Sequence, residues 1–378
     1  QQSSGPAYFV HALDLGSLTD KVTPQAVTGS HTLTNGTTYS FNATYQRQRP
    51  ALLLANGNVY AAFGSFCDKA PNLSRGWVLG WQTGTLTPLP GNQLLDMQST
   101  DMGQYFLSSI WMSGAGPAAD DSGNVLFITA NSDPSGNTYD GITDIQESVI
   151  QVSSDLSTVL DLFTPSDVAY LDENDQDFGS GGVMVLPDQP GAIPHLAVAA
   201  GKEGSMFLMN EDDLGGFSTQ TNNVLGTYAI GPCWCGESYF VDPTDNAARV
   251  VSSGGTNIIV WKLLTSPTPS LTEVTSSPKL NTVGTGFFTS VSSNGTANPI
   301  IWALSRPTGK QTAVYLYAFS PDLGGTTMKQ LFMGTAGTWV ANGANTNLVP
   351  VVANGKVFVA SYKELVILGV KPKGADKR

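Results

Sequence analysis

The sequence predicts an all-β fold built from repeated antiparallel sheets. Short runs rich in β-branched and aromatic residues recur along the chain, often after an Asn-Gly or Ser-Gly-Asn turn, and such turns supply the positive φ values that tight hairpins require. Helical patterning is nearly absent, and only 165–176 and 209–216 predict a turn or two of helix. Charged residues make up 13% of the chain and hydrophobic residues 41%, a balance that argues against disorder.

The β-rich runs form a repeat. Six segments share the pattern, at 55–65, 121–131, 194–210, 248–263, 298–307 and 353–369. Equivalent positions in successive segments lie 53 to 72 residues apart. Periods of about 40–50 residues with several strands each are typical of propeller blades, and the longer intervals would carry loop insertions. We therefore predict a β-propeller of four-stranded antiparallel blades, with six recognisable blades in a seven- or eight-bladed ring.

The domain organisation follows from the absence of a Pro- or Ser-rich linker. We predict a single propeller domain over residues 1–378. Within it, residues 1–44 form a partial first blade and connecting loop, 45–370 the six blades, and 371–378 a basic tail.

The two ends of the repeat carry a further expectation. Residues 8–18 resemble the third strand of a blade, and the chain ends on three strands. Because an open ring leaves unpaired strand edges, the last blade needs a partner. We expect either a second polypeptide (the separate N-terminal fragment of the same precursor, or another protein) or pairing of residues 8–15 with 365–370.

Charge and hydropathy exclude two classes of partner. The formal net charge is −12, and the 18 Lys and Arg residues form no cluster apart from the tail, so nucleic acid is not expected to bind. No apolar run approaches the ~18 residues of a membrane span. The N-terminal segment shows no signal peptide, as in a mature exported chain.

Ten segments together resemble a known family. They are VHALDL, YQRQRPALLLANGNVYAAFGSFCD, RGWVLGW, SSIWMSGAGPAAD, DFGSGGVMVLPDQP, HLAVAAGKEGSMFLMN, CWCGESYF, GFFTSVSSNGT, IIWALSRP and VPVVANGKVFVASYK. They resemble bacterial pyrroloquinoline-quinone-like propeller proteins along nearly the whole chain. The resemblance implies a periplasmic or extracellular protein and makes pyrroloquinoline quinone and calcium the candidate cofactors.

The motif Cys233-Trp234-Cys235 allows several interpretations. A metal site would need further ligands, and only Cys67 and three histidines could supply them. A disulfide within the pair, or one to Cys67, is an alternative, as are two buried thiols in a rigid turn. Quinoprotein alcohol dehydrogenases stack their quinone between a tryptophan and a disulfide of adjacent cysteines, so the resemblance makes Trp234, Cys233 and Cys235 candidate cofactor-binding residues.

Two isolated cations are candidates for the same role. Arg49 and Lys202 lie in stretches of apolar or small residues, where a buried charge usually has a partner. Either could hold an anionic ligand, and Arg49 could instead bridge two blades through a carboxylate.

Asp177 is the candidate catalytic residue. It precedes the glycine-rich turn GSGG and a strand. A functional role would make it a general base or a cation ligand, whereas the alternative is a turn in which glycines let backbone approach backbone. No phosphate-binding loop, dinucleotide fingerprint or Gly-x-Ser-x-Gly elbow occurs.

Calcium has weak candidate ligands in two acidic loops. Asp133 and Asn137 alternate as in calcium loops, and so do Asp172 and Asn174. No distal glutamate completes either pattern. Solvated acidic loops are the alternative.

Two functions follow as hypotheses. The first is an exported quinoprotein-like propeller, either a dehydrogenase of alcohols or sugars or a relative that has lost the cofactor. The second is a non-catalytic scaffold that binds a protein partner or a glycan. The tryptophans are predicted to pack between blades rather than to form a ligand box, at Trp77, Trp81, Trp111, Trp261 and Trp302.

Overall fold

The computed structural model describes residues 5–66, 74–99, 107–132, 139–321, 325–340 and 345–369. It consists of two compact units. The first comprises Gln1–Val185, His195–Glu203 and Met209–Val224, and the second comprises Leu186–Pro194, Gly204–Leu208 and Leu225–Arg378.

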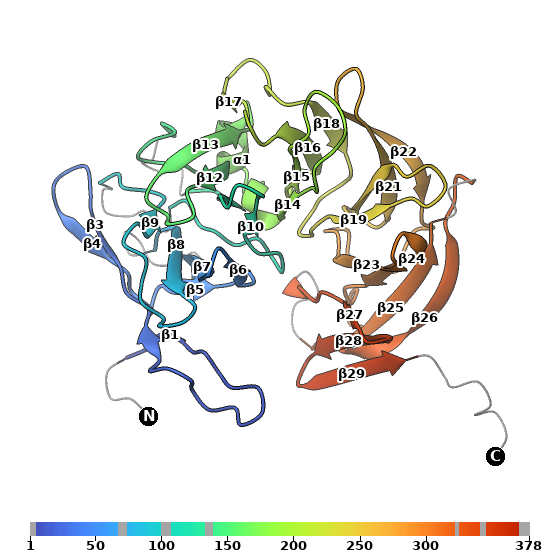
Figure 1. The fold of residues 1–378 in the computed structure, drawn as a ribbon, viewed down its shortest axis with the longest axis horizontal. Coiled ribbons are helices and arrows are strands. Elements are labelled where there is room, and N and C mark those ends of the chain that lie inside the picture. Colours follow the sequence, from blue (N-terminus) through green and yellow to red (C-terminus); the bar gives the residue numbers. More distant parts are fainter. Residues whose placement is uncertain are drawn as a thin grey trace. The chain divides into compact units, whose positions relative to one another are not determined.

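The first unit is built from sheets whose strands mostly follow one another along the chain and pair antiparallel (Figure 1), with β17 added in parallel to β13. One sheet contains β5 (Gln46–Gln48), β6 (Leu53–Ala55), β7 (Asn58–Ser65), β8 (Trp77–Gln82) and β9 (Gln93–Leu94). The next contains β10 (Ala118–Ala119), β11 (Val125–Ile128), β12 (Val149–Val152), β13 (Val159–Thr164) and β17 (Gly216–Phe217). Shorter pairs are β1 (Phe9–Val10) with β2 (Gln25–Ala26), β3 (Ser30–Thr32) with β4 (Thr38–Ser40), and β14 (Val183–Val185) with β15 (Leu196–Ala200).

The second unit repeats the same plan. β16 (Ser205–Asn210), whose residues up to Leu208 belong to this unit, pairs with β18 (Gly226–Ala229). A four-stranded sheet follows, made of β19 (Ser238–Val241), β20 (Ala248–Ser252), β21 (Ile259–Leu264) and β22 (Ser270–Ser276), and then another, made of β23 (Thr289–Asn294), β24 (Ala297–Leu304), β25 (Ala313–Ser320) and β26 (Lys329–Thr338). The last sheet has three strands, β27 (Val351–Ala353), β28 (Lys356–Ser361) and β29 (Glu364–Gly369).

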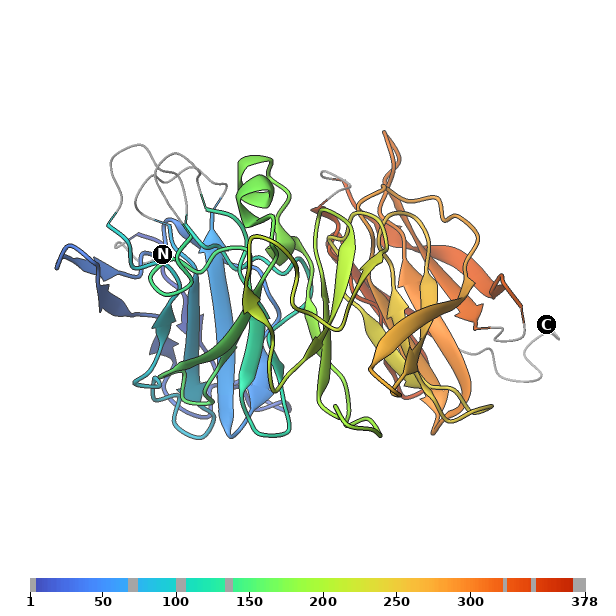
Figure 2. The ribbon, with the colours of Figure 1, turned by 90° about the horizontal axis from the view of Figure 1, so that it is seen from above.

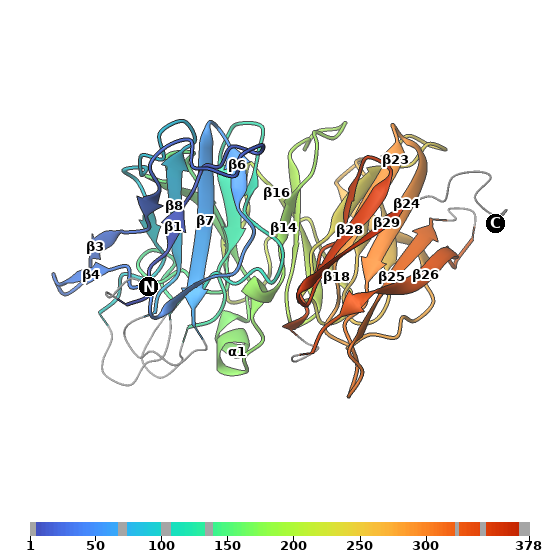
Figure 3. The same ribbon diagram turned by 90° about the horizontal axis from the view of Figure 1, so that it is seen from below.

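These four-stranded antiparallel meanders are the blades of a β-propeller, and the predicted fold class is confirmed. The structure is 3% helical. The helix predicted within 165–176 is present as α1 (Val168–Glu173), beyond the strand ends of the first unit (Figures 2 and 3). The prediction of a helix at 209–216 is wrong, because β16 extends to Asn210 and a turn follows it.

The pairing of the first strand, β1, does not test the expected closure of the propeller ring. Phe9–Val10 pair with Gln25–Ala26, within the first unit. The expected pairing of 8–15 with 365–370, the second polypeptide and the single-domain arrangement all stay predictions. No helix in the described part of the chain is long and apolar enough to cross a membrane.

A buried ion pair stabilises the first unit. The Arg75 guanidinium is 1% exposed, and its Nη1 donates to Asp96 Oδ1 at 2.9 Å and to the carbonyl oxygens of Asp96 and Gln98 at 2.9 and 2.8 Å. Its Cζ lies 5.0 Å from the centroid of the Tyr39 ring. Burial lowers the pKa of Arg75, which Asp96 opposes. These contacts tie the start of β8 to the segment after β9.

Candidate functional site

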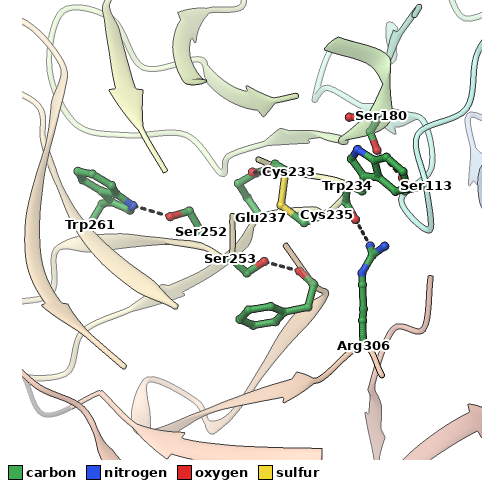
Figure 4. The surroundings of a disulfide bond; sticks show 11 residues. Ser113, Ser180, Cys233, Trp234, Cys235, Glu237, Ser252, Ser253, Trp261 and Arg306 are labelled. Carbon is green, nitrogen blue, oxygen red and sulfur yellow. Dashed lines mark hydrogen bonds between the residues drawn. A yellow bond between two sulfur atoms is a disulfide. The ribbon is translucent and has the colours of Figure 1, made fainter. Parts of the chain in front are cut away.

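The Cys-Trp-Cys motif is a disulfide loop of the second unit (Figure 4). Cys233 and Cys235 are bonded to each other, with their Cα atoms 4.8 Å apart. Both cysteines are 0% exposed. Among the interpretations that the sequence left open, the structure has the disulfide within the pair; Cys67 lies outside the described residues.

Backbone contacts hold this loop in place. Trp234 N donates to the Thr285 carbonyl oxygen at 2.8 Å, and Gly255 N donates to that of Pro232 at 2.8 Å. A Cβ on Gly286 would lie 3.2 Å from Cys235 Cβ and 2.9 Å from the Ser253 carbonyl oxygen. The loop therefore packs directly on glycine backbone, where a side chain has little room.

Arg306 is a functional candidate that sequence reasoning missed. Its guanidinium donates to the carbonyl oxygen of Trp234 (Figure 4). The residue is 1% exposed, and its Cζ lies 6.0 Å from the centroid of the Phe288 ring. The signal available in the sequence was an arginine directly after the apolar strand IIWALS. Arg306 positions the disulfide loop.

Glu237 adds a third polar group beside the sulfurs. The Sγ atom of Cys233 lies 4.0 Å from Glu237 Oε1, and Glu237 Oε2 has no hydrogen-bond partner among the residues that the structure describes. Burial raises the pKa of Glu237 to about 8. The two sulfurs and the carboxylate lie within 4.8 Å of one another, close enough for a metal. Because thiolates are the metal ligands and these sulfurs are bonded to each other, such a site would require reduction of the disulfide.

The quinone platform implied by the family resemblance does not fit this loop. A stacked quinone ring needs an accessible face of the disulfide, yet both cysteines are fully buried. Gly286 packs closely against Cys235, and a methyl group added there would clash with the Ser253 carbonyl oxygen.

Asp177 and Lys202 lie together in the first unit. Lys202 Nζ is 3.4 Å from Asp177 Oδ2 and 2.8 Å from Asp175 Oδ2. The Lys202 backbone N–H also donates to the Asp177 carbonyl oxygen at 3.0 Å. Burial alone would lower the pKa of Lys202, but the charges of Asp177 and Asp175 outweigh it and raise that pKa. Lys202 thus links two aspartates, of which Asp175 is exposed and Asp177 is buried.

Glu147 extends this cluster and was also missed. It is 0% exposed, and its Oε2 accepts a hydrogen bond from the Phe178 backbone N–H at 2.6 Å. Burial, and then the charge of Asp177, raise the pKa of Glu147 well above its usual range. Its backbone φ is +50°, an unusual value outside glycine. A carboxyl with a raised pKa beside an ionised one can exchange protons, but substrate cannot reach a fully buried group.

The predicted cofactor residues fall in different units. Arg49, half-buried before Pro50, belongs with Asp177 and Lys202 to the first unit, whereas Trp234 and both cysteines belong to the second. The roles assigned to Asp177, Arg49 and Lys202 stay predictions.

Only two of the four calcium candidates lie in the described part of the chain. Asp133 and Asn137 lie outside the described residues. Asp172 Oδ1 accepts a hydrogen bond from the Ser132 backbone N–H at 2.6 Å. Asn174 Nδ2 donates to the Tyr170 carbonyl oxygen at 3.0 Å, at the end of α1. These bonds favour structural roles for Asp172 and Asn174, and calcium binding stays a prediction.

A groove in the second unit is an additional candidate. It has a volume of about 830 Å³ and lies between the sheet of β23–β26 and the sheet of β27–β29, which Figure 3 shows side by side. Strand register explains its floor. Trp302, Ala318 and Phe332 form one row across the first sheet. Val352, Val357 and Leu368 form a row across the second.

Alternation along β24 explains why this face is apolar. Ile301 and Ala303 pack into the core on one side of the sheet. Trp302 and Leu304 point to the other side, toward the last sheet. The groove is the solvent-exposed end of the apolar core that these residues form between the two sheets. Trp302 is half-buried, and its indole N–H donates to Ser292 Oγ at 2.8 Å. Trp302 packs against the core between the two sheets, as predicted, and it also lines the groove.

The rim of the groove is polar. Two hairpin turns, at Asn294–Gly295 and Asn354–Gly355, border it together with Asn298 and Lys356. Phe332 is 40% exposed. The groove thus combines an apolar floor, aromatic rings and neutral amides in an open hollow, which is the usual make-up of a small-molecule site.

Comparison with known proteins gives little beyond this. No family model matches the sequence, and no curated protein matches it. Solved structures are similar at low identity. Sqt1 from Saccharomyces cerevisiae is 10% identical, covers 88% of this chain and 74% of its own, and has a TM-score of 0.45.

Two further structures are similar at the same level. The β-propeller domain of Cps50 (Swd1) from Myceliophteria thermophila is 10% identical, with 86% of this chain and 96% of that chain covered and a TM-score of 0.39. A glucose dehydrogenase is 13% identical, with 76% and 80% covered and a TM-score of 0.37. These values say nothing about activity.

The disulfide predicts a thiol count. The chain has 3 cysteines, and Cys233 and Cys235 are bonded. We therefore expect the denatured, unreduced protein to titrate one thiol per chain with a thiol-reactive chromophore, and three after reduction. Three thiols before reduction would contradict the disulfide.

Proposed function

We propose that this chain is a quinoprotein-like β-propeller that is exported to the periplasm or the cell exterior and binds a small amphipathic ligand without quinone chemistry. The observation that carries the proposal is the groove between the sheets β23–β26 and β27–β29. Its volume of about 830 Å³ lies in the range of small-molecule pockets.

The groove offers binding energy from its floor. Phe332 and Trp302 remain partly exposed in one row. A flat apolar ligand would remove this surface from water, at roughly 25 cal/mol per Å², and would stack on the rings. Because the Ser292 hydroxyl fixes the indole of Trp302, the floor needs little rearrangement to bind.

The disulfide loop supports a binding role over a dehydrogenase role. Cys235 packs against Gly286 through its Cβ, and the Trp234 backbone is hydrogen-bonded to Thr285 and Arg306. The loop therefore has a structural role in the second unit, where it holds neighbouring segments together. A disulfide also persists in an oxidising compartment, which supports export.

A fluorescent probe tests the proposal. N-phenyl-1-naphthylamine is an uncharged aromatic compound whose emission rises in apolar surroundings. We expect the native protein to bind it with one saturable site, and Phe332→Ser to weaken binding by about fivefold, since a large part of one aromatic contact is lost.

The matched control is Met333→Ser. Met333 is 46% exposed on the same strand, next to Phe332, and it pairs with Tyr317, which packs into the core on the face away from the groove. It should bind the probe like the native protein. No saturable binding, or equal affinity in both variants and the native protein, would overturn the proposal.

A further inference from the structure

The charges around the groove are unusual for this protein. Lys356 is the one charged residue among the described residues that line it, and no carboxylate lines it. The chain as a whole carries a formal charge of −12. We propose that the groove selects an aromatic or apolar ligand that bears one anionic group, which Lys356 binds at the rim. This inference rests on the proposed function and adds the chemistry of the ligand.

The backbone around Lys356 lets its side chain reach the groove. Lys356 opens β28 directly after the Asn354–Gly355 turn and pairs with Ala353 and Gly369. By strand alternation its Cβ leaves the sheet on the face opposite Val357, so Lys356 borders the groove at the end of the sheet and does not rise from the floor that Val357 helps to form. Its neighbours on that face, Ala353 and Gly369, have almost no side chains to block the stem.

The stem of Lys356 indeed lies over the glycine. Its Cγ is 3.6 Å from the position that a Cβ on Gly369 would occupy, and Gly369 lines the groove. The methylene groups thus lie against the edge of the sheet, as lysine stems do when they cover apolar surface while the ammonium stays in water.

The ammonium of Lys356 is available to a ligand. Lys356 is exposed, and in the described part of the chain no carboxylate lies within ion-pair distance of it. Two other lysines, Lys202 and Lys262, do have carboxylate partners, and neither lines the groove.

Neutral donors complement the cation. The amide side chains of Asn294 and Asn354 stand at the two turns of the rim, where their N–H groups can donate to an anion. Over the apolar floor, an ion pair is less screened than one fully in water.

A pair of probes that differ only in charge tests this inference. The probe 8-anilinonaphthalene-1-sulfonate is N-phenyl-1-naphthylamine with an added sulfonate. We expect Lys356→Gln to weaken binding of the sulfonate probe by about fivefold, in line with a partly screened ion pair, and to leave binding of the uncharged probe unchanged. Raising the salt concentration should weaken only the sulfonate probe in the native protein.

The control variant is Lys310→Gln. Lys310 is exposed in the turn between β24 and β25 and does not line the groove, so both probes should bind this variant as they bind the native protein. Phe332→Ser should weaken both probes, which locates both in the groove.

The outcomes separate the two proposals. Equal effects of Lys356→Gln on both probes, or no effect on the sulfonate probe, would overturn the selection of an anion and leave the groove as a binding site. Failure of the uncharged probe to bind would instead overturn the proposed function.

Discussion

Replacing Arg75 by methionine is expected to lower the free energy of unfolding by about 3–5 kcal/mol, because it leaves Asp96 as an unpaired buried carboxylate. Asp96 is 0% exposed, and Arg75 Nη1 also donates to two carbonyl oxygens. Urea denaturation followed by tryptophan fluorescence measures the change.

Two further variants make this prediction specific. Arg47→Met removes an exposed arginine that lies 5.5 Å from the Phe66 ring, and it should cost less than about 1 kcal/mol. The double variant Arg75→Met with Asp96→Leu should recover part of the loss, since no unpaired charge remains. A single variant as stable as the native protein would contradict the role of the ion pair.

The substitution Glu237→Gln is expected to change how stability depends on pH. Burial raises the pKa of Glu237 from 4.5 to about 8. At pH values below about 4.5 the carboxyl is protonated in both the folded and the unfolded chain. As the pH rises, the unfolded chain releases its proton first, so the folded protein loses stability until its own carboxyl ionises near pH 8.

The glutamine variant lacks this titration. Its advantage in unfolding free energy over the native protein should grow by up to about 1.4 kcal/mol per pH unit across that window and level off above it. Urea denaturation at pH steps through the window measures the difference. Glu273→Gln, on an exposed position of β22, is the control and should follow the native profile. Parallel profiles for Glu237→Gln and the native protein would rule out the buried carboxyl as the cause.

Most of the fold could be predicted from the sequence because strand signals are local. The segments ANGNVYAAFGS and ANGKVFVASYK each contain a turn and alternating apolar residues, and both form hairpins. The segment 209–216 is predicted as a helix because Asn210 is a residue that often starts one, whereas Asn210 ends β16 and bridges to Asp213, and Gly216 pairs with β13.

The candidate sites were less predictable because they depend on contacts between distant residues. Lys202 and Asp177 were both selected from the sequence, and they form an ion pair. Glu147 meets the backbone of Phe178 across 31 positions of sequence, and Arg306 meets Trp234 across 72. The groove depends on the register of two sheets, so no local motif marks it.

The buried carboxyls change the electrical character of the native molecule. Glu147 and Asp144 have pKa values raised well above their usual range, chiefly by burial, and that of Glu237 is about 8. With a pKa of about 8, Glu237 is largely protonated at neutral pH, so the folded chain is less negative than the formal count of −12. Unfolding exposes Glu237 to water, where it ionises and releases its proton into the buffer. The calorimetric heat of unfolding should consequently depend on the ionisation enthalpy of the buffer, and the folded protein should focus at a higher pH than its unfolded form.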